Sequence, residues 1–313
     1  MENRRRIKSV QDWQNVVQDL QDPDSKIDVL ALRIDTYKAI EDYRKKPLIV
    51  YASQFIENLP YSIQNTINIE DVDGFIDMCG SIGKDKKEVD VLLHSPGGDP
   101  SATERIVDVL RNRFDVVNFL VPHSAYSAAT MLALSGNEII LSLDAVLGPI
   151  DPQISGIPAR QIKRGFEKIK EQIAKDGPSH LPAYIPMIEK YTIDLLELCE
   201  DAEKLSRELV LNWLSQYMFA NNNTEDEIIK NIEEAVNFFA DYETHLIHSR
   251  PLPFKRISHL GLKITVADDI LQELLREAYL LINGFFSIAP FAKLYETTNG
   301  INWGKQYRSP VNN

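Results

Sequence analysis

The sequence predicts an α/β fold in which helices cover both faces of a central sheet. Short segments made almost entirely of apolar residues, such as 47–53 and 116–122, alternate with segments of helical periodicity. A strand that is apolar at nearly every position is typically buried on both of its faces. The length of 313 residues is sufficient for one large domain, or two coupled ones, with a large core.

The first 45 residues predict an accessory helical arm. One apolar stripe runs along residues 10–20 and contains Val10, Trp13, Val16, Val17 and Leu20. The next part of the chain alternates in type, with strands expected at 47–53, 88–94, 116–122 and 138–143 and helices at 69–82, 101–114 and 127–136. This alternation predicts the α/β core.

The second half of the chain is mostly helical in pattern. Residues 155–240 predict a helical insertion that includes a long amphipathic helix at 192–218. Residues 243–268 predict a loop, a short helix and a last strand, and the chain beyond 269 is expected to be helical and then irregular. We therefore expect an arm at 1–45, a main domain at 46–290 and a tail at 291–313.

Composition excludes several kinds of partner. The formal net charge of −12 argues against nucleic acid or an anionic membrane surface, since both reward basic patches. Neither the two cysteines, Cys79 and Cys199, nor the six histidines have metal-ligand spacing, so we predict no metal and no cofactor. The charged start and the absence of an apolar run of membrane-spanning length predict a soluble, cytoplasmic protein with reduced cysteines.

A Gly-Gly turn follows the second predicted strand. In "LLHSPGGDPSAT" (92–103), Gly97 and Gly98 free the backbone to expose N–H groups to a ligand. An ordinary turn between a strand and a helix is the alternative interpretation. A third stretch, "DAVLGPIDPQ" (144–153), is adequately explained as a rigid turn after a strand.

A serine surrounded by small residues follows the third predicted strand. In "VPHSAYSAATMLALSG" (121–136), Ser127 falls where the next helix begins. A helix N-terminus stabilises developing negative charge, and the N–H of Ala128 would point toward the oxygen of an attacked carbonyl. The alternative is that Ser127 simply caps a buried helix.

Taken in order, "LLHSPGG", "VPHSAYSAATMLAL" and "AVLGPIDPQ" resemble the ClpP/crotonase superfamily. The sequence is most similar to the serine dehydrogenase proteinase family, which comprises ClpP-class serine peptidases related to signal peptide peptidase A. The resemblance covers roughly residues 45–300, leaves the N-terminal arm outside, and implies a spiral of ββα units with flanking helices. It implies that Ser127 is the acyl nucleophile, with the N–H groups of Ala128 and of Gly97 or Gly98 as oxyanion donors.

The resemblance leaves the general base open. ClpP uses a histidine soon after its fourth strand, where this chain has "GPIDPQ" and no histidine. The relatives of signal peptide peptidase A use a lysine downstream of the serine, and Lys204 fits that position best, with Lys190 as the second choice. A lysine acts as a base where burial lowers its pKa toward neutrality, whereas most helix lysines form surface ion pairs.

Histidines are the other candidates for the base. His248 matches a family position near the third catalytic element of the superfamily, where it would act as the base or orient it. His245 and His123 are further candidates, although a satisfied polar histidine is the usual role of such residues.

The resulting hypothesis is a serine endopeptidase that acts on peptides or proteins, forms a homo-oligomer and works with or without an unfoldase partner. Two alternatives remain at this point. A crotonase-type acyl-CoA or thioester enzyme would use the same pair of amides without a serine nucleophile. A non-catalytic scaffold or binding protein on the same fold would explain the missing histidine.

Overall fold

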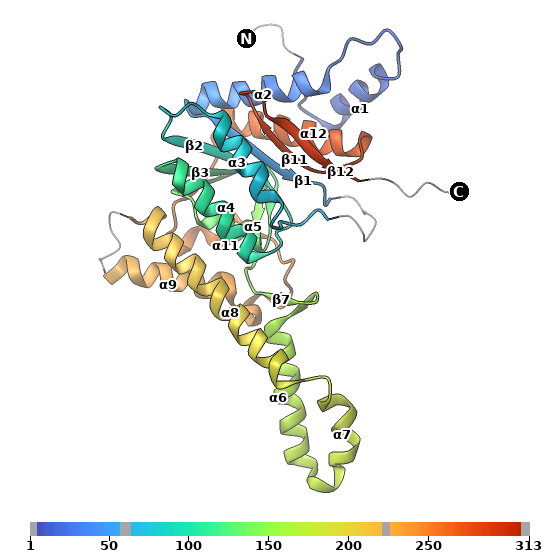
Figure 1. The fold of residues 1–313 in the computed structure, drawn as a ribbon, viewed down its shortest axis with the longest axis vertical. Helices are drawn as coiled ribbons and strands as arrows, with labels where there is room; N and C mark the ends of the chain where they lie inside the picture. The colour runs from blue at the N-terminus through green and yellow to red at the C-terminus, as the bar shows by residue number, and fades with distance from the viewer. Residues whose placement is uncertain (1–4, 57–63, 221–225, 308–313) are drawn as a thin grey trace.

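A seven-stranded mixed sheet forms the centre of the molecule in the computed structural model, which describes residues 5–56, 64–220 and 226–307 (Figure 1). The strand order is β10-β5-β3-β2-β1-β11-β12. The strands are β1 (Leu48–Ser53), β2 (Glu88–His94), β3 (Val116–Val121), β5 (Glu138–Leu141), β10 (Ile264–Val266), β11 (Phe291–Thr297) and β12 (Asn302–Gln306). The strands from β10 to β1 are parallel, whereas β11 and β12 are antiparallel additions. The α/β class is confirmed.

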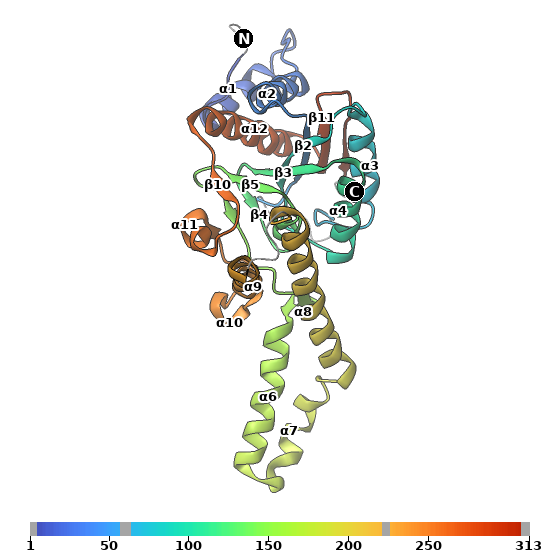
Figure 2. The ribbon, with the colours of Figure 1, turned by 90° about the vertical axis from the view of Figure 1, so that its left-hand side faces the viewer.

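Helices cover both faces of this sheet, as the nearly all-apolar strands predict. One face carries α3 (Asp71–Ser81), α4 (Pro100–Arg113), α5 (Ala128–Leu134) and the C-terminal part of α8 (Ile193–Trp213). The other face carries α2 (Val29–Arg44) and α12 (Asp269–Ile288), with α1 (Val10–Asp19) packed on α12 (Figure 2). Successive residues of β1 enter the two cores in turn, since Ile49 belongs to one and Val50 to the other.

Two of the central strands are each followed by a short strand of a second, smaller sheet. β3 leads into β4 (Ser124–Ala125) and β5 leads into β6 (Val146–Leu147), and these two short strands pair in parallel. β9 (Leu252–Pro253) pairs with β6, and Ser95, just after β2, bridges to Ala125. A strand, a short second strand and then a helix, repeated along the chain, make up the ββα spiral that the resemblance implies. The spiral also brings the ends of β2, β4 and β6 together.

A helical projection extends away from the sheet (Figures 1 and 2). It consists of α6 (Ala159–Asp176), α7 (Leu181–Ile188) and the N-terminal part of α8, and we call it the projecting arm. A hairpin of β7 (Gln153–Ile154) and β8 (Ile157–Pro158) joins it to the body. After a π-helical turn at Leu214–Met218, the chain returns through α9 (Asp226–Ala240), α10 (Tyr242–His245) and α11 (Phe254–Ile257).

The prediction of an irregular segment beyond the last helix is wrong. Residues 291–297 form β11, which pairs with β1, and 302–306 form β12 at the edge, while 308–313 lie outside the described residues. The pattern misled because β11 contains three polar residues that are fully or almost fully buried, namely Lys293, Glu296 and Thr297. Glu296, for example, is buried in an ion pair with Arg33 of α2 at 2.8 Å.

Candidate active site

Ser127 lies on a strained turn between β4 and α5. Its backbone angles are φ 52° and ψ −124°, a conformation that costs a non-glycine residue on the order of 1–3 kcal/mol. The turn is held by hydrogen bonds on either side, from Tyr126 N to Ser95 O (3.1 Å) and from Met131 N to Ser127 O (3.1 Å). Although Ser127 precedes the helix, its side chain makes no capping hydrogen bond. The half-buried hydroxyl is therefore not used as the cap that the sequence offered as an alternative.

The Gly97–Gly98 turn lies directly against this serine. Gly97 has φ +91°, and a Cβ placed on it would lie 2.7 Å from Ser127 Cβ and 2.8 Å from Ala128 N. Only glycine fits such an approach between two backbones. The Gly97 N–H donates to Ser95 Oγ (3.2 Å). In contrast, the N–H groups of Gly98 and Ala128 have no hydrogen-bond partner within the described parts of the chain.

The segment before α3 fixes the position of the Gly-Gly turn. Ile67 N donates to Gly97 O (2.7 Å), and Asp99 N donates to Ile67 O (2.9 Å). The preceding carbonyl, Thr66 O, accepts a hydrogen bond from Lys293 Nζ at 2.6 Å. A residue of β11 is therefore hydrogen-bonded to the segment that holds the turn.

Lys293 is a fully buried cation paired with a fully buried carboxylate. Its Nζ lies 2.8 Å from both carboxylate oxygens of Asp71, which also accepts hydrogen bonds from the hydroxyls of Tyr51 and Tyr295. Burial lowers the pKa of Lys293, and the charge of Asp71 opposes that shift. Sequence reasoning missed both residues because it expected no strand at 291–297.

A cavity of about 410 Å³ opens in front of Ser127. Ser127, Gly98 and His248 line it together with Ser206, and its walls include Met131, Ile150 and Leu205. Ser127 and His248, 121 positions apart in the sequence, therefore line the same cavity. The size and the mixture of apolar walls with a few polar groups are typical of a ligand site.

A buried carboxylate orients His248. The Nδ1 of His248 lies 3.0 Å from Asp151 Oδ1, and Asp151 is only 2% exposed. A carboxylate that accepts the Nδ1–H of a histidine leaves Nε2 as the nitrogen that can take a proton. Asp151 belongs to the stretch 144–153, which sequence analysis interpreted as a structural turn. Its only signal was an acidic residue between an isoleucine and a proline at the end of a strand.

The structure does not bring either candidate lysine to Ser127. Ala202, Leu205 and Ser206 of α8 line the cavity, whereas Lys204 lies on another face of the helix and is exposed. Lys190 is also exposed and lines a different cavity, in the projecting arm. The geometry therefore gives the expected lysine base no support.

The other two candidate histidines are engaged elsewhere. His245 is buried, and its Nε2 lies 2.6 Å from the carbonyl oxygen of Phe238. His123 stacks on Tyr279 with ring centroids 4.5 Å apart, and burial lowers its pKa. Neither residue lines the cavity in front of Ser127.

A further buried histidine, His94, lies three residues before the Gly-Gly turn. It ends β2, is 1% exposed, and its ring lies 5.6 Å from that of His123. Neither ring nitrogen makes a hydrogen bond of normal geometry to the described residues. Burial, with a smaller contribution from His123, lowers the pKa of His94 to about 3. The His94 ring is consequently neutral at physiological pH.

The described residues contain neither a metal-binding cluster nor a membrane-spanning helix. No group of three or more His, Cys, Asp or Glu side chains in residues 5–56, 64–220 and 226–307 is arranged to hold a metal ion. Among those same residues, no helix combines the length and the apolar character needed to cross a membrane. Cys79 and Cys199 are both buried and form no disulfide.

Comparison with known proteins shows which family this chain is similar to. A family model described as ClpP-like SDH-type serine proteinase matches residues 20–282. The uncharacterized protein MJ1495 of Methanocaldococcus jannaschii is 25% identical over 234 residues, which cover 74% of this chain and 71% of that protein. MJ0137 of the same organism, also uncharacterized, is 27% identical over 220 residues, which cover 68% of this chain and 74% of that protein. The family match includes α2, which sequence analysis placed outside the resemblance.

Proposed function

Because the chain belongs to the family of ClpP-like SDH-type serine proteinases, we propose that it is a serine endopeptidase with Ser127 as nucleophile and His248 as general base. Asp151 is the carboxylate that orients the base. The observation that carries this proposal is the single cavity lined by both Ser127 and His248, with His248 held by buried Asp151. Nucleophile, base and orienting group are the three parts that activate a serine hydroxyl.

The reaction begins with transfer of the Ser127 hydroxyl proton to His248 Nε2 as Oγ attacks the peptide carbonyl carbon. The carbonyl π electrons move onto oxygen and form a tetrahedral oxyanion. Collapse of this intermediate breaks the C–N bond, and the proton on His248 passes to the leaving amine. Water, deprotonated by the same histidine, then hydrolyses the acyl-enzyme and regenerates Ser127.

The oxyanion is placed between the backbone N–H groups of Gly98 and Ala128. Gly98 is preferred over Gly97 because the Gly97 N–H already donates to Ser95 Oγ. Ala128 is the first residue of α5, so its N–H adds the positive end of that helix. Removal of one such donor in a serine protease costs about a hundredfold to a thousandfold in kcat.

A fluorophosphonate probe tests the nucleophile and the base together. Labelling of the full chain should be abolished in Ser127→Ala and strongly slowed in His248→Ala. Lys204→Ala is the matched control, since it removes the exposed lysine that sequence analysis favoured, and it should label at the rate of the unmodified chain.

Two outcomes would overturn the proposal. Absence of labelling in a folded sample, or undiminished labelling of Ser127→Ala, removes Ser127 as nucleophile. Slowed labelling of Lys204→Ala together with normal labelling of His248→Ala returns the role of base to the lysine.

A further inference from the structure

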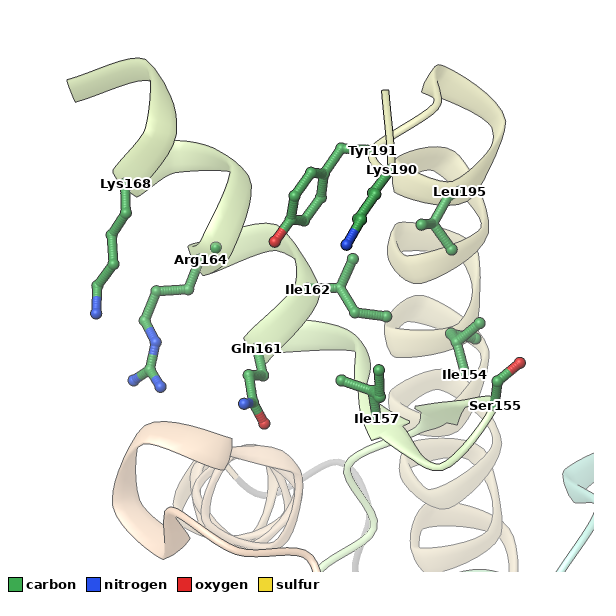
Figure 3. Close-up of a pocket in the computed structure, with 11 residues that line it drawn as sticks. Ile154, Ser155, Ile157, Gln161, Ile162, Arg164, Lys168, Lys190, Tyr191 and Leu195 are labelled. Carbon is green, nitrogen blue, oxygen red and sulfur yellow. The ribbon is translucent and has the colours of Figure 1, made fainter. Parts of the chain in front are cut away.

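A second cavity, of about 540 Å³, lies in the projecting arm where it joins the body (Figure 3). It is bounded by the β7–β8 hairpin, by α6 and by the segment that leads into α8. In Figure 3, Lys190 and Tyr191 reach from that segment toward α6. Gln161, Arg164 and Lys168 lie along one side of α6. This cavity plays no part in the reaction described above.

The polar lining is basic in a chain that is acidic as a whole. Arg164, Lys168 and Lys190 line the cavity, and no acidic residue is among its described lining residues, although the formal net charge of the chain is −12. Arg164 donates to Glu243 at 2.9 Å. Lys168 and Lys190, in contrast, form no ion pair within the described part of the protein. Their charges are available to an anion.

The floor of the cavity is apolar and close-packed. Ile154, Ile162 and Leu195 contribute to it, and Ile162 is 8% exposed. Gly165 lets Tyr191 lie against α6, because a Cβ at that position would be 2.6 Å from the Tyr191 hydroxyl oxygen. This hydroxyl makes no hydrogen bond to the described residues, so it adds a free donor beside Lys190 in the chain. The cavity therefore offers an apolar surface next to cationic and hydroxyl donors.

This cavity adjoins the one in front of Ser127. Ile154 of β7 lines both, and Ser155, the next residue, lines the cavity in the arm. The two cavities therefore meet at Ile154, which an extended polypeptide would pass in steps of about 3.3 Å per residue. A polypeptide bound across Ser127 can thus place a neighbouring segment in the cavity of the projecting arm.

We propose that the cavity in the arm binds the carboxyl terminus of a polypeptide whose last side chain is apolar. The terminal carboxylate pairs with Lys190 and accepts from the Tyr191 hydroxyl, Lys168 and Arg164 add positive charge, and the side chain rests on Ile154 and Ile162. A carboxylate and an apolar group on one residue match this combination of donors and floor. That the bound end belongs to a substrate rests on the proposed function, whereas the binding itself does not.

Fluorescence anisotropy on the full chain carrying Ser127→Ala, which blocks cleavage, tests the proposal. The probe is a peptide with an N-terminal fluorophore and a C-terminal leucine, prepared as the free acid and as the amide. The free acid should bind about tenfold more tightly than the amide, as expected for a charge-assisted hydrogen bond. Lys190→Gln should remove this preference, and Tyr191→Phe should weaken it. Lys175→Gln, which neutralises an exposed lysine of α6 outside the lining, should preserve it.

Equal binding of acid and amide, or the same loss in Lys175→Gln as in Lys190→Gln, would overturn the proposal. Octanoate also combines a carboxylate with an apolar chain. Stronger binding of octanoate than of the peptide would therefore assign the cavity to fatty acids and would also overturn the proposal. The probe experiment on Ser127 separates the two proposals. If the free acid binds more tightly than the amide but the chain is not labelled by the fluorophosphonate, only the proposed peptidase activity is refuted. If the chain is labelled but binds acid and amide equally, only the proposed binding of a carboxyl terminus is refuted.

Discussion

Replacement of Lys293 by methionine should destabilise the fold far more than a surface substitution would. The change keeps the length and the apolar stem of the side chain but removes its charge. Asp71 would then remain fully buried without a counter-charge, and Thr66 O would lose its donor. Breaking a buried ion pair by removing one partner costs about 3–5 kcal/mol, because the remaining charge is uncompensated.

Such a loss is a large share of the free energy of unfolding of a typical domain, which is about 5–15 kcal/mol. Urea denaturation followed by circular dichroism measures it directly. Lys305→Met is the matched control, since Lys305 of the neighbouring strand pairs with exposed Glu70. An ion pair at the surface is worth about 0–1 kcal/mol.

Equal losses in the two variants, or a loss below about 1 kcal/mol for Lys293→Met, would refute the reasoning that burial makes this pair indispensable. A second measurement tests the link to the active site. The folded fraction of Lys293→Met should react with the fluorophosphonate more slowly than Lys305→Met does, because Thr66 and Ile67 position the Gly-Gly turn.

Three further predictions follow from the same geometry, and a fourth, that the chain forms a homo-oligomer, follows from the family resemblance. Gly97→Ala should abolish fluorophosphonate labelling while circular dichroism stays unchanged, because the new Cβ would collide with Ser127 Cβ; Gly80→Ala, with nothing within 4 Å, should label normally. Asp151→Asn should slow labelling by about a thousandfold to ten-thousandfold, since the histidine loses its orienting carboxylate. The pKa of His94, about 3 in the folded chain, is below its unfolded value, so its contribution to stability is complete above pH 6.5 and falls with pH toward 3. Replacing His94 with leucine should therefore reduce the loss of unfolding free energy between pH 7.5 and 4.5 by about 3 kcal/mol, measured by urea titration at both pH values. Sedimentation velocity should detect a homo-oligomer, and a purely monomeric chain at micromolar concentration would contradict that expectation.

The sequence predicts the central strands well because a run of consecutive apolar residues indicates a strand that is buried on both faces. β1 and β3 are apolar at all but one position each and β2 at four of its seven positions, and the structure places all three in the middle of the sheet. β11 escapes the same reasoning because its polar residues are buried through partners far away in the chain. Lys293 pairs with Asp71, 222 residues away, and no local pattern reveals such a pairing.

The same distinction applies to the candidate site. Ser127, Ala128 and the two glycines lie at the junctions of predicted elements, where local spacing left an ordinary turn and a helix cap open, and it was the family resemblance that assigned them roles. The pairing of His248 with Asp151 joins positions 97 residues apart and depends on the return of the chain through α10 and β9. On α8, Leu205 lines the cavity in front of Ser127, whereas the adjacent Lys204 is exposed on another face of the helix. The amphipathic pattern of 192–218 alone did not show which of these two neighbouring residues faces the serine.

The place of Lys293 in the order of synthesis has a consequence for when the protein can act. A ribosome completes Ser127, Asp151 and His248 before it adds β11. Until β11 docks beside β1, Thr66 lacks its donor and the Gly-Gly turn lacks its anchor. A nascent chain, or one cut before residue 291, thus contains Ser127 beside a Gly-Gly turn that lacks this anchor. Docking of this late strand would therefore have to precede any reaction proposed for Ser127.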